Sequence, residues 1–154
     1  MSYVSHRFQF RVYYEDTDHG GVVYYANYLK FMERGRTEYL RAANIELDEV
    51  ESGYGVLFAV TEANIRYISP ALFNDLLEVD SVLTDARGAR MGFKQQIWRM
   101  HRNSDTQNET RDTLLAEAEI KLACIDRSGN AKRIPASLLP ALQIHKSNTP
   151  GKER

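Results

Sequence analysis

A carboxylate and the start of a helix lie within one short segment of this chain, residues 14–27. Asp18 stands seven positions before Tyr25 and is followed by Gly20 and Gly21, a pair that permits tight backbone paths. The first turn of a helix leaves backbone N–H groups unpaired and carries the positive end of the helix dipole. We therefore expect a base and an electrophile-binding group to face one pocket.

The rest of the segment is aromatic and apolar, as a pocket lining would be. Val22 lies beside the glycines, and four tyrosines lie close by in the sequence: Tyr14, Tyr24, Tyr25 and Tyr28. Asn27 is the only favourable capping residue near the helix start, so some N–H groups stay available for an oxyanion. An ordinary acidic turn and a water-capped helix end are the alternatives.

Other chemistries find less support in this segment. His19 could assist proton transfer, since an unperturbed histidine has a pKa of about 6.5, or it could be an exposed loop residue. We expect no metal, because a calcium loop starting at Asp16 would place Gly20 and Asn27 at ligand positions. The chain also lacks the glycine-rich motifs of serine hydrolases, P-loop proteins and dinucleotide-binding proteins.

A basic cluster, Arg87, Arg90 and Lys94, occupies an expected turn and the strand after it. Such a cluster is usually a solvated hairpin end. Alternatively, Arg87 and Arg90 bind the phosphates of a nucleotide-bearing substrate, since guanidinium groups match phosphate geometry.

The composition is that of an ordinary globular domain. The chain has 154 residues, 43% of them hydrophobic, and a net charge of −1, which gives no global attraction to nucleic acid. We find no apolar run near the ~20 residues of a membrane span and no signal peptide, so we expect a cytoplasmic protein. Cys124 is the only cysteine and lies on the apolar face of an expected strand, which favours packing over catalysis.

The periodicity of apolar residues predicts the elements that position this segment. Residues 7–14 alternate as a half-buried strand, and residues 26–43 carry a broad apolar stripe at helical spacing. Gly35 lies inside that helix, where we expect a close backbone approach by the sheet. Four further strands follow, at about 57–68, 76–86, 91–101 and 112–125, and residues 137–143 form a short helical turn. In the last strand, Leu114 and Ala116 should begin the buried face.

Short connections between the four later strands predict an antiparallel meander. The simplest way to bury the helix is to curl a five-stranded antiparallel sheet around it, an α+β fold. We assign residues 1–143 to this single domain and 144–154 to a disordered tail. Because an open sheet retains unpaired edges, pairing of edges between two copies is expected.

In the segment that contains Asp18, the chain resembles the 4-hydroxybenzoyl-CoA thioesterase family of hotdog-fold proteins. The shared motif, with Glu33 and Arg36 on the following helix, reads Tyr14-x-x-Thr17-Asp18-x-x-Gly21-Val22-Val23-Tyr24-Tyr25-x-Asn27-Tyr28. The similarity runs from about Phe8 to Pro140 and includes Arg66-Tyr67 and Ser69-Pro70-Ala71. It is strongest to the bacterial acyl-CoA thioesterases associated with the Tol-Pal envelope system.

The resemblance implies hydrolysis of an acyl-CoA to a free acid and CoA without a metal or cofactor. Asp18 matches the catalytic aspartate, which acts as nucleophile or as general base toward water. Tyr25 matches the position whose backbone N–H polarises the thioester carbonyl. Family sites lie between subunits of homodimers or homotetramers, so Arg66 and Tyr67 of a partner chain would complete a pocket lined by the segment's other residues: Gly21, Val22 and Asn27.

One residue departs from the Tol-Pal-associated branch, many of whose members carry histidine where Tyr25 stands. This chain would then depend on the backbone donor or on His19. The main alternative function is a non-catalytic protein that holds an acyl group or an acyl-carrier protein, with at most peripheral membrane contact. A hydratase is a third alternative, which would need a histidine–aspartate pair that the sequence does not reveal.

Overall fold

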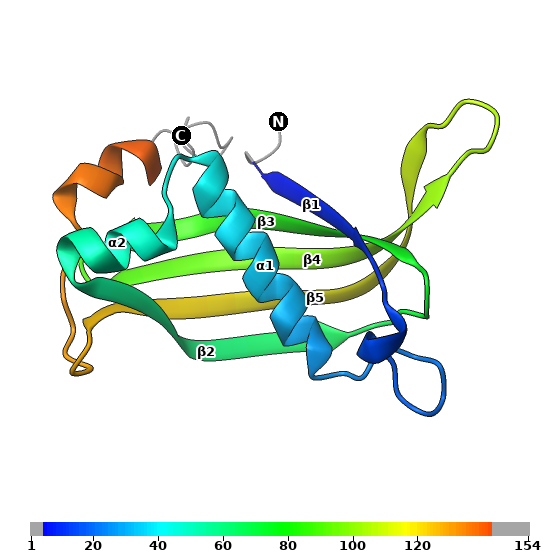
Figure 1. Cartoon of the computed structure of the whole chain (residues 1–154), viewed down its shortest axis with the longest axis horizontal. Helices are drawn as coiled ribbons and strands as arrows, with labels where there is room; N and C mark the ends of the chain where they lie inside the picture. Colours follow the sequence, from blue (N-terminus) through cyan, green and yellow to red (C-terminus); the bar gives the residue numbers. More distant parts are fainter. Residues whose placement is uncertain (1–4, 143–154) are drawn as a thin grey trace, which may run out of the picture.

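A five-stranded antiparallel sheet and a long helix make up most of the computed structural model, which describes residues 5–142 (Figure 1). The strands are β1 (His6–Arg11), β2 (Val56–Tyr67), β3 (Leu76–Arg87), β4 (Arg90–Arg102) and β5 (Glu109–Asp126). The helices are α1 (Asn27–Ala42) and α2 (Leu47–Tyr54), with 3₁₀ turns at Tyr14–Asp16 and Ala136–Leu138. The predicted α+β architecture is confirmed.

The strand order is β1-β3-β4-β5-β2, and every neighbouring pair is antiparallel. Strands β3, β4 and β5 form the expected meander, but β2 pairs with β5 and leaves the edge of β3 to β1. The prediction of a four-stranded meander was therefore wrong for β2. Strands lie about 4.8 Å apart, so the segment 68–75, which can reach roughly 26 Å, is long enough to cross the end of the sheet.

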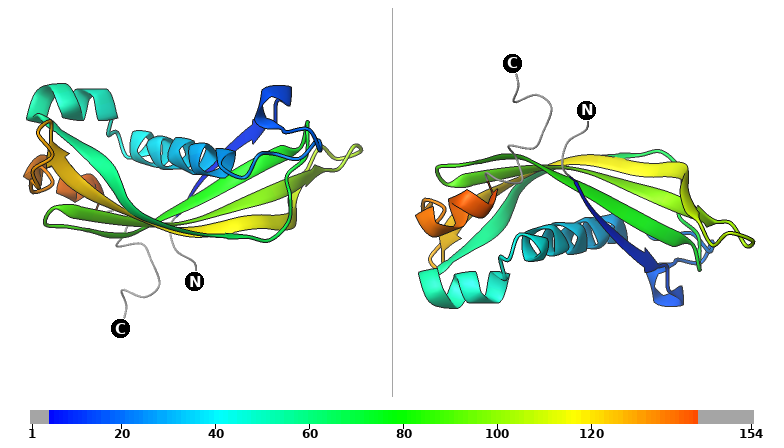
Figure 2. Two further views of the ribbon diagram at one scale, coloured as in Figure 1. Left: turned by 90° about the horizontal axis from the view of Figure 1, so that it is seen from below. Right: turned by 90° about the horizontal axis from the view of Figure 1, so that it is seen from above.

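Helix α1 lies across one face of the sheet, as both views in Figure 2 show. Its apolar stripe faces β1, β3 and β4, with Phe31 and Met32 fully buried. Gly35 is the point of closest approach: a Cβ there would stand 2.5 Å from Val79 Cγ1 and 2.9 Å from Ser81 Oγ. The expected close contact between this glycine and the sheet is confirmed.

Strand β1 ends at Arg11, three residues before the predicted end at Tyr14. The carboxylate of Asp16 accepts a hydrogen bond from the Tyr13 N–H at 2.8 Å and begins a 3₁₀ turn. Such a local bond between a side chain and the backbone competes with the strand ladder. Tyr14 is consequently exposed, at 80%, and does not continue the buried face.

Helix α2 is an element that the periodicity of the sequence did not reveal. It has eight residues and buries only Val50, so its apolar stripe is too short to recognise. Helical backbone over 136–142 agrees with the predicted turn at 137–143 as far as residue 142, where the described residues end. The predicted disordered tail, 144–154, lies outside the described residues.

Strand β5 shows the predicted alternation from Ala116 to Cys124. At its start, however, Leu115 is fully buried and Leu114 is only partly so. The predicted inward position of Leu114 was wrong, because a register shift opposite Ile97 and Trp98 inserts one residue and reverses the alternation.

Candidate active site

Asp18 lies in a tight loop that folds back on itself. Its N–H donates to the carbonyl of Val22 at 2.9 Å, and its own carbonyl accepts from the Gly21 N–H at 3.1 Å. An isolated antiparallel bridge between Thr17 and Val23 closes the base of the loop. Gly21 has φ of +80°, a left-handed conformation that explains why glycine occupies this position.

The carboxylate of Asp18 is exposed, and one of its two oxygens is engaged. Oδ1 accepts a hydrogen bond from the Gly20 N–H at 2.9 Å, which fixes the side-chain rotamer. Within residues 5–142, Oδ2 has no hydrogen-bond partner. The loop thus presents one oriented carboxylate oxygen, available to attack an electrophile or to take a proton from water.

The start of α1 has no side-chain cap. Ala26 is the N-cap residue, and the N–H groups of Tyr25 and Ala26 donate to no acceptor in the described part of the chain. Asn27, expected near the cap and in the pocket, instead donates from Nδ2 to the carbonyl of Asp16 at 2.9 Å. Two free donors therefore stand at the positive end of the helix.

The crossover from β2 to β3 holds both the Asp18 loop and α1. The carbonyl of Ala71 accepts from the Val23 N–H at 2.8 Å, while the N–H of Ala71 donates to the Tyr28 hydroxyl at 2.9 Å. Val22 forms a bridge to Leu72 on the same segment. One crossover residue thereby links the loop that carries the carboxylate to the helix that carries the free N–H groups.

Arg99, which the sequence analysis did not single out, supports this crossover. Its Nε donates to the Asp75 carboxylate at 2.9 Å, and Nη2 donates to the Pro70 carbonyl at 2.7 Å. Tyr28 was expected among the aromatic residues of the pocket segment, but not as a hydrogen-bond partner of the crossover. Its type was a usable signal, because a buried tyrosine hydroxyl normally needs a hydrogen-bond partner.

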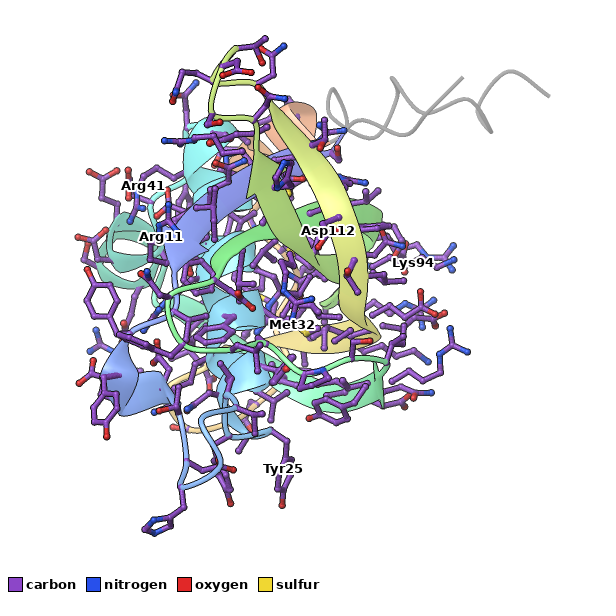
Figure 3. All side chains as sticks on the ribbon, turned by 90° about the vertical axis from the view of Figure 1, so that its right-hand side faces the viewer. Arg11, Tyr25, Met32, Arg41, Lys94 and Asp112 are labelled. Carbon is purple, nitrogen blue, oxygen red and sulfur yellow. The ribbon has the colours of Figure 1, made fainter. Side chains whose placement is uncertain are left out.

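Tyrosines surround the helix start. Tyr25 is 62% exposed at one end of the molecule, where Figure 3 labels it apart from the buried Met32. Tyr67 lies edge-on to the rings of both Tyr25 and Tyr28. Burial raises the pKa of the Tyr28 hydroxyl. It also raises the pKa of the Tyr67 hydroxyl, which lies less deep in the protein. Both hydroxyls are thus protonated and able to donate near neutral pH.

Arg66 points away from this cluster, although it precedes Tyr67. Successive residues of a strand face opposite sides, and Arg66 forms an ion pair with Glu117 on the face of the sheet opposite α1. That face holds a hollow of about 610 Å³ lined by both polar and apolar side chains, among them Asn64, Lys94 and Val82. Since the hollow includes no residue of the Asp18 loop, we do not assign the chemistry to it.

Arg87 and Arg90 lie at the opposite end of β3 from the Asp18 loop. Both form ion pairs with Asp85, at 3.3 and 3.5 Å from their Nε atoms. The 12 residues of β3 span roughly 40 Å at about 3.3 Å each, so one chain does not bring these arginines to its own Asp18.

Two further residues were considered for catalysis, His19 and Cys124. His19 is exposed in the turn that follows Asp18. Cys124 is buried and its thiol pKa is raised by desolvation, which confirms its packing role.

No three His, Cys, Asp or Glu side chains within the described ranges cluster as metal ligands would. No helix in these residues has the length and apolar character needed to span a membrane.

Comparison with known proteins identifies relatives over most of the chain. The family model of the thioesterase-like superfamily matches residues 12–142. The acyl-CoA thioesterase YbgC of Haemophilus influenzae is 41% identical over 119 residues, which cover 77% of this chain and 79% of the relative. The acyl-CoA thioesterase YbgC of Helicobacter pylori is 34% identical over 118 residues, covering 77% and 84% of the two chains.

Solved structures agree with these sequence relationships. A probable thioesterase from Bartonella henselae has a TM-score of 0.74 at 34% identity and covers 85% of this chain and 99% of its own. A 4-hydroxybenzoyl-CoA thioesterase in complex with 4-hydroxybenzoyl-CoA has a TM-score of 0.76 at 16% identity, with 90% and 99% covered. The second likeness shows the fold alone, which is the predicted hotdog arrangement.

Proposed function

This chain belongs to the thioesterase-like superfamily, and from that membership we propose that it hydrolyses acyl-CoA thioesters with Asp18 and the first N–H groups of α1. Its relatives at 34–41% identity are named acyl-CoA thioesterases, so an enzyme that releases a free acid and CoA is the function that the chain supports. None of the described contacts favours the non-catalytic alternative.

In this mechanism the thioester carbonyl oxygen accepts a hydrogen bond from the Tyr25 N–H, which stabilises the negative charge that develops there. Loss of one such donor typically costs ~2.7–4 kcal/mol in acyl transfer. The free Oδ2 of Asp18 then follows one of two routes. It attacks the carbonyl carbon, expels the CoA thiolate and forms a mixed anhydride that water hydrolyses, or it removes a proton from the water that attacks.

The observation that carries the proposal is a pair of backbone hydrogen bonds made by Ala71. Its carbonyl fastens the Asp18 loop through Val23, and its N–H fastens α1 through Tyr28. The carboxylate and the helix start are therefore parts of one hydrogen-bonded framework. Such a framework favours catalysis, because the reacting groups need no reordering when substrate binds.

Asp18→Asn is the direct test. The asparagine carbonyl oxygen can still accept from the Gly20 N–H, so the loop should keep its shape and the melting temperature should not change. We expect kcat to fall by about 10²- to 10⁴-fold on a panel of short, long and aromatic acyl-CoAs, because the basic and nucleophilic oxygen is lost.

Glu15→Gln is the matched control, since Glu15 is an exposed carboxylate of the same segment. It should retain wild-type turnover. Full activity of the Asp18→Asn variant would overturn the assignment. A single turnover stopped by rapid quench separates the two routes, because only nucleophilic attack leaves the acyl group bound to the Asp18 carboxylate, where mass spectrometry of the peptide detects it.

We further propose a dimer in which β2 of two copies pair edge to edge. β2 forms one edge of the sheet, Val60 on this strand is 49% exposed, and Ile68, directly after the strand, is 45% exposed. An unpaired edge of 12 residues is a template for a further strand, and a two-fold axis makes the paired strands antiparallel. The Val56 end of one β2 then lies beside the Tyr67 end of the other.

This pairing gives Arg87 and Arg90 a role across the dimer. Arg90 pairs with Ala123, which also pairs with Ala59, so the arginine hairpin belongs to the Val56 end of the sheet. In the dimer that end approaches the Asp18 loop of the other copy. Arg87 and Arg90 would there bind CoA phosphates for their neighbour's site.

Several expectations stay predictions. They are an acyl-carrier protein as acyl donor, a tetramer, contributions of His19, Gly21, Val22, Asn27 and Arg66 to substrate binding or turnover, a cytoplasmic location, peripheral membrane contact and an association with the Tol-Pal system. Hydrolysis rates with acyl-CoA and acyl-carrier-protein thioesters of the same acyl group would decide the first of them.

A further inference from the structure

Tyr67 makes a contact with the backbone of the candidate site in its own chain. Its hydroxyl donates a hydrogen bond to the carbonyl oxygen of Tyr25 at 3.2 Å. The resemblance implied instead that Tyr67 completes the pocket of a partner chain. The observed bond therefore points to a different use of this side chain.

Aromatic packing holds the Tyr67 ring in place for this bond. Its centroid lies 6.1 Å from that of Tyr25 and 5.2 Å from that of Tyr28, with interplanar angles of 89° and 85°. Edge-to-face pairs at such distances are favourable. The ring of Tyr28 is in turn fixed through its hydroxyl by the Ala71 N–H at 2.9 Å.

The bonded carbonyl belongs to the peptide that opens the first helical turn. The Tyr25 carbonyl also accepts from the Tyr28 N–H at 3.3 Å, so two donors fix the plane of the Tyr25–Ala26 peptide. Fixing this plane restricts the backbone on the carboxyl side of Tyr25. The N–H of Tyr25, which we propose binds the thioester carbonyl oxygen, lies on the other side of the same residue. Hydrogen bonds accepted by a carbonyl also polarise the N–H of the same peptide, here that of Ala26.

We propose that Tyr67 is a positioning residue for the oxyanion donors, acting within its own chain through the carbonyl of Tyr25. This inference rests on the proposed function, because it concerns the same N–H groups. Tyr67 holds the first turn of α1 in the conformation that receives the developing negative charge. It acts through the backbone of Tyr25 and Ala26 and does not itself bind the reacting carbonyl.

Tyr67→Phe tests this role, because it removes the hydroxyl and keeps the ring. We expect kcat to fall about tenfold, the effect of one hydrogen bond worth ~1.4 kcal/mol in the transition state. The KM for acyl-CoA and the melting temperature should stay the same. Replacing Tyr67 with 3-fluorotyrosine retains the donor and should retain kcat within about twofold.

Tyr13→Phe is the matched control, since Tyr13 precedes the segment of the candidate site, its hydroxyl takes part in no hydrogen bond with a described residue and its side chain is 64% exposed. It should leave kcat and KM unchanged. A purely structural role of Tyr67 would instead lower the melting temperature, and a role in substrate binding would raise KM at constant kcat. Either result, or a wild-type kcat for Tyr67→Phe, would overturn the inference.

Asp18→Asn measured in the same assay separates this inference from the proposed function. An inactive Asp18→Asn beside a fully active Tyr67→Phe rejects the positioning role and leaves the function standing. Full activity of both variants rejects the function and, with it, the role of Tyr67. If Tyr67→Phe fails to fold, a loss of kcat in the folded 3-fluorotyrosine protein contradicts the inference.

Discussion

At the scale of single residues, the candidate site depends on a few local bonds that hold Asp18. One carboxylate oxygen is occupied by the Gly20 N–H, and the loop closes through Val22. Only Gly21 in this loop has a positive φ, +80°, so its lack of a side chain is a requirement of the backbone path. The chemistry proposed for Asp18 would thus depend on the conformation of a residue three positions later.

Gly21→Ala should disturb the site without a steric clash, because no atom lies within 4 Å of a Cβ placed there. A left-handed conformation costs a residue with a Cβ about 1–2 kcal/mol, so the free energy of unfolding should fall by this amount and kcat should also fall. Urea denaturation and steady-state kinetics measure the two effects. Gly21→Asn should lower the free energy of unfolding and kcat less, since asparagine tolerates this conformation. A Gly21→Ala variant with the same free energy of unfolding and kcat as wild type would contradict the argument.

At the scale of elements, α1 is placed by its contact with the sheet as much as by its own apolar stripe. Gly35 allows the helix axis to approach β3 closely, next to Val79 and Ser81. The first turn of the same helix carries the N–H groups of the candidate site. A change in the middle of the helix therefore affects where those groups stand.

Gly35→Ala should destabilise the protein, although alanine is the better helix former. Its Cβ would lie 2.5 Å from Val79 Cγ1, so the helix or the strand must shift, at a cost of about 1–3 kcal/mol. Thermal or urea unfolding measures this loss. Gly53→Ala in α2 is the control: nothing lies within 4 Å of the added Cβ, and we expect a gain of up to ~1 kcal/mol. An equal change in the free energy of unfolding for the two variants would rule out close packing as the reason for glycine at position 35.

At the scale of the whole molecule, the open edge of β2 and the distant arginine hairpin lead to the same assembly. Within one chain, the length of β3 separates Arg87 and Arg90 from Asp18. The proposed antiparallel pairing of two β2 strands would bring this hairpin to the Asp18 loop of the other copy. Among residues 5–142, neither α1 nor α2 covers the other side of the sheet (Figure 2), and the proposed dimer does not use that side.

Mixed dimers test the exchange of residues between copies. The double variant Arg87→Gln/Arg90→Gln should raise the KM for acyl-CoA about tenfold or more, since hydrogen bonds to charged groups are worth ~1.5–3 kcal/mol. Heterodimers of this variant with Asp18→Asn should recover about half of wild-type activity, because one of their two sites then has both Asp18 and intact arginines.

An acyl-pantetheine thioester is the control substrate for this experiment, since it lacks the nucleotide phosphates. Its KM should be the same for the double variant and the wild type. Heterodimers without recovered activity, or a monomeric mass for the fully active protein in light scattering, would contradict the proposed dimer.

The sequence by itself determined most of the elements and the residue that we propose as the catalytic carboxylate. Alternation and helical spacing are local properties, so α1, the five strands and the close contact at Gly35 could be predicted to within a few residues at most ends. Asp18 could be singled out because a carboxylate, a glycine pair and a helix start are neighbours in the chain. Helix α2 was missed because eight residues with one buried side chain show no clear period.

Only the tertiary structure decided which segments meet. The place of β2 beside β5, the opposite directions of Arg66 and Tyr67, and the bonds from Ala71 and Tyr67 to the site all join residues 42 or more positions apart. Such contacts depend on strand order and on a single-residue register shift, and neither is recorded in the local pattern of apolar residues. The geometry around Asp18 is therefore a property of the assembled sheet.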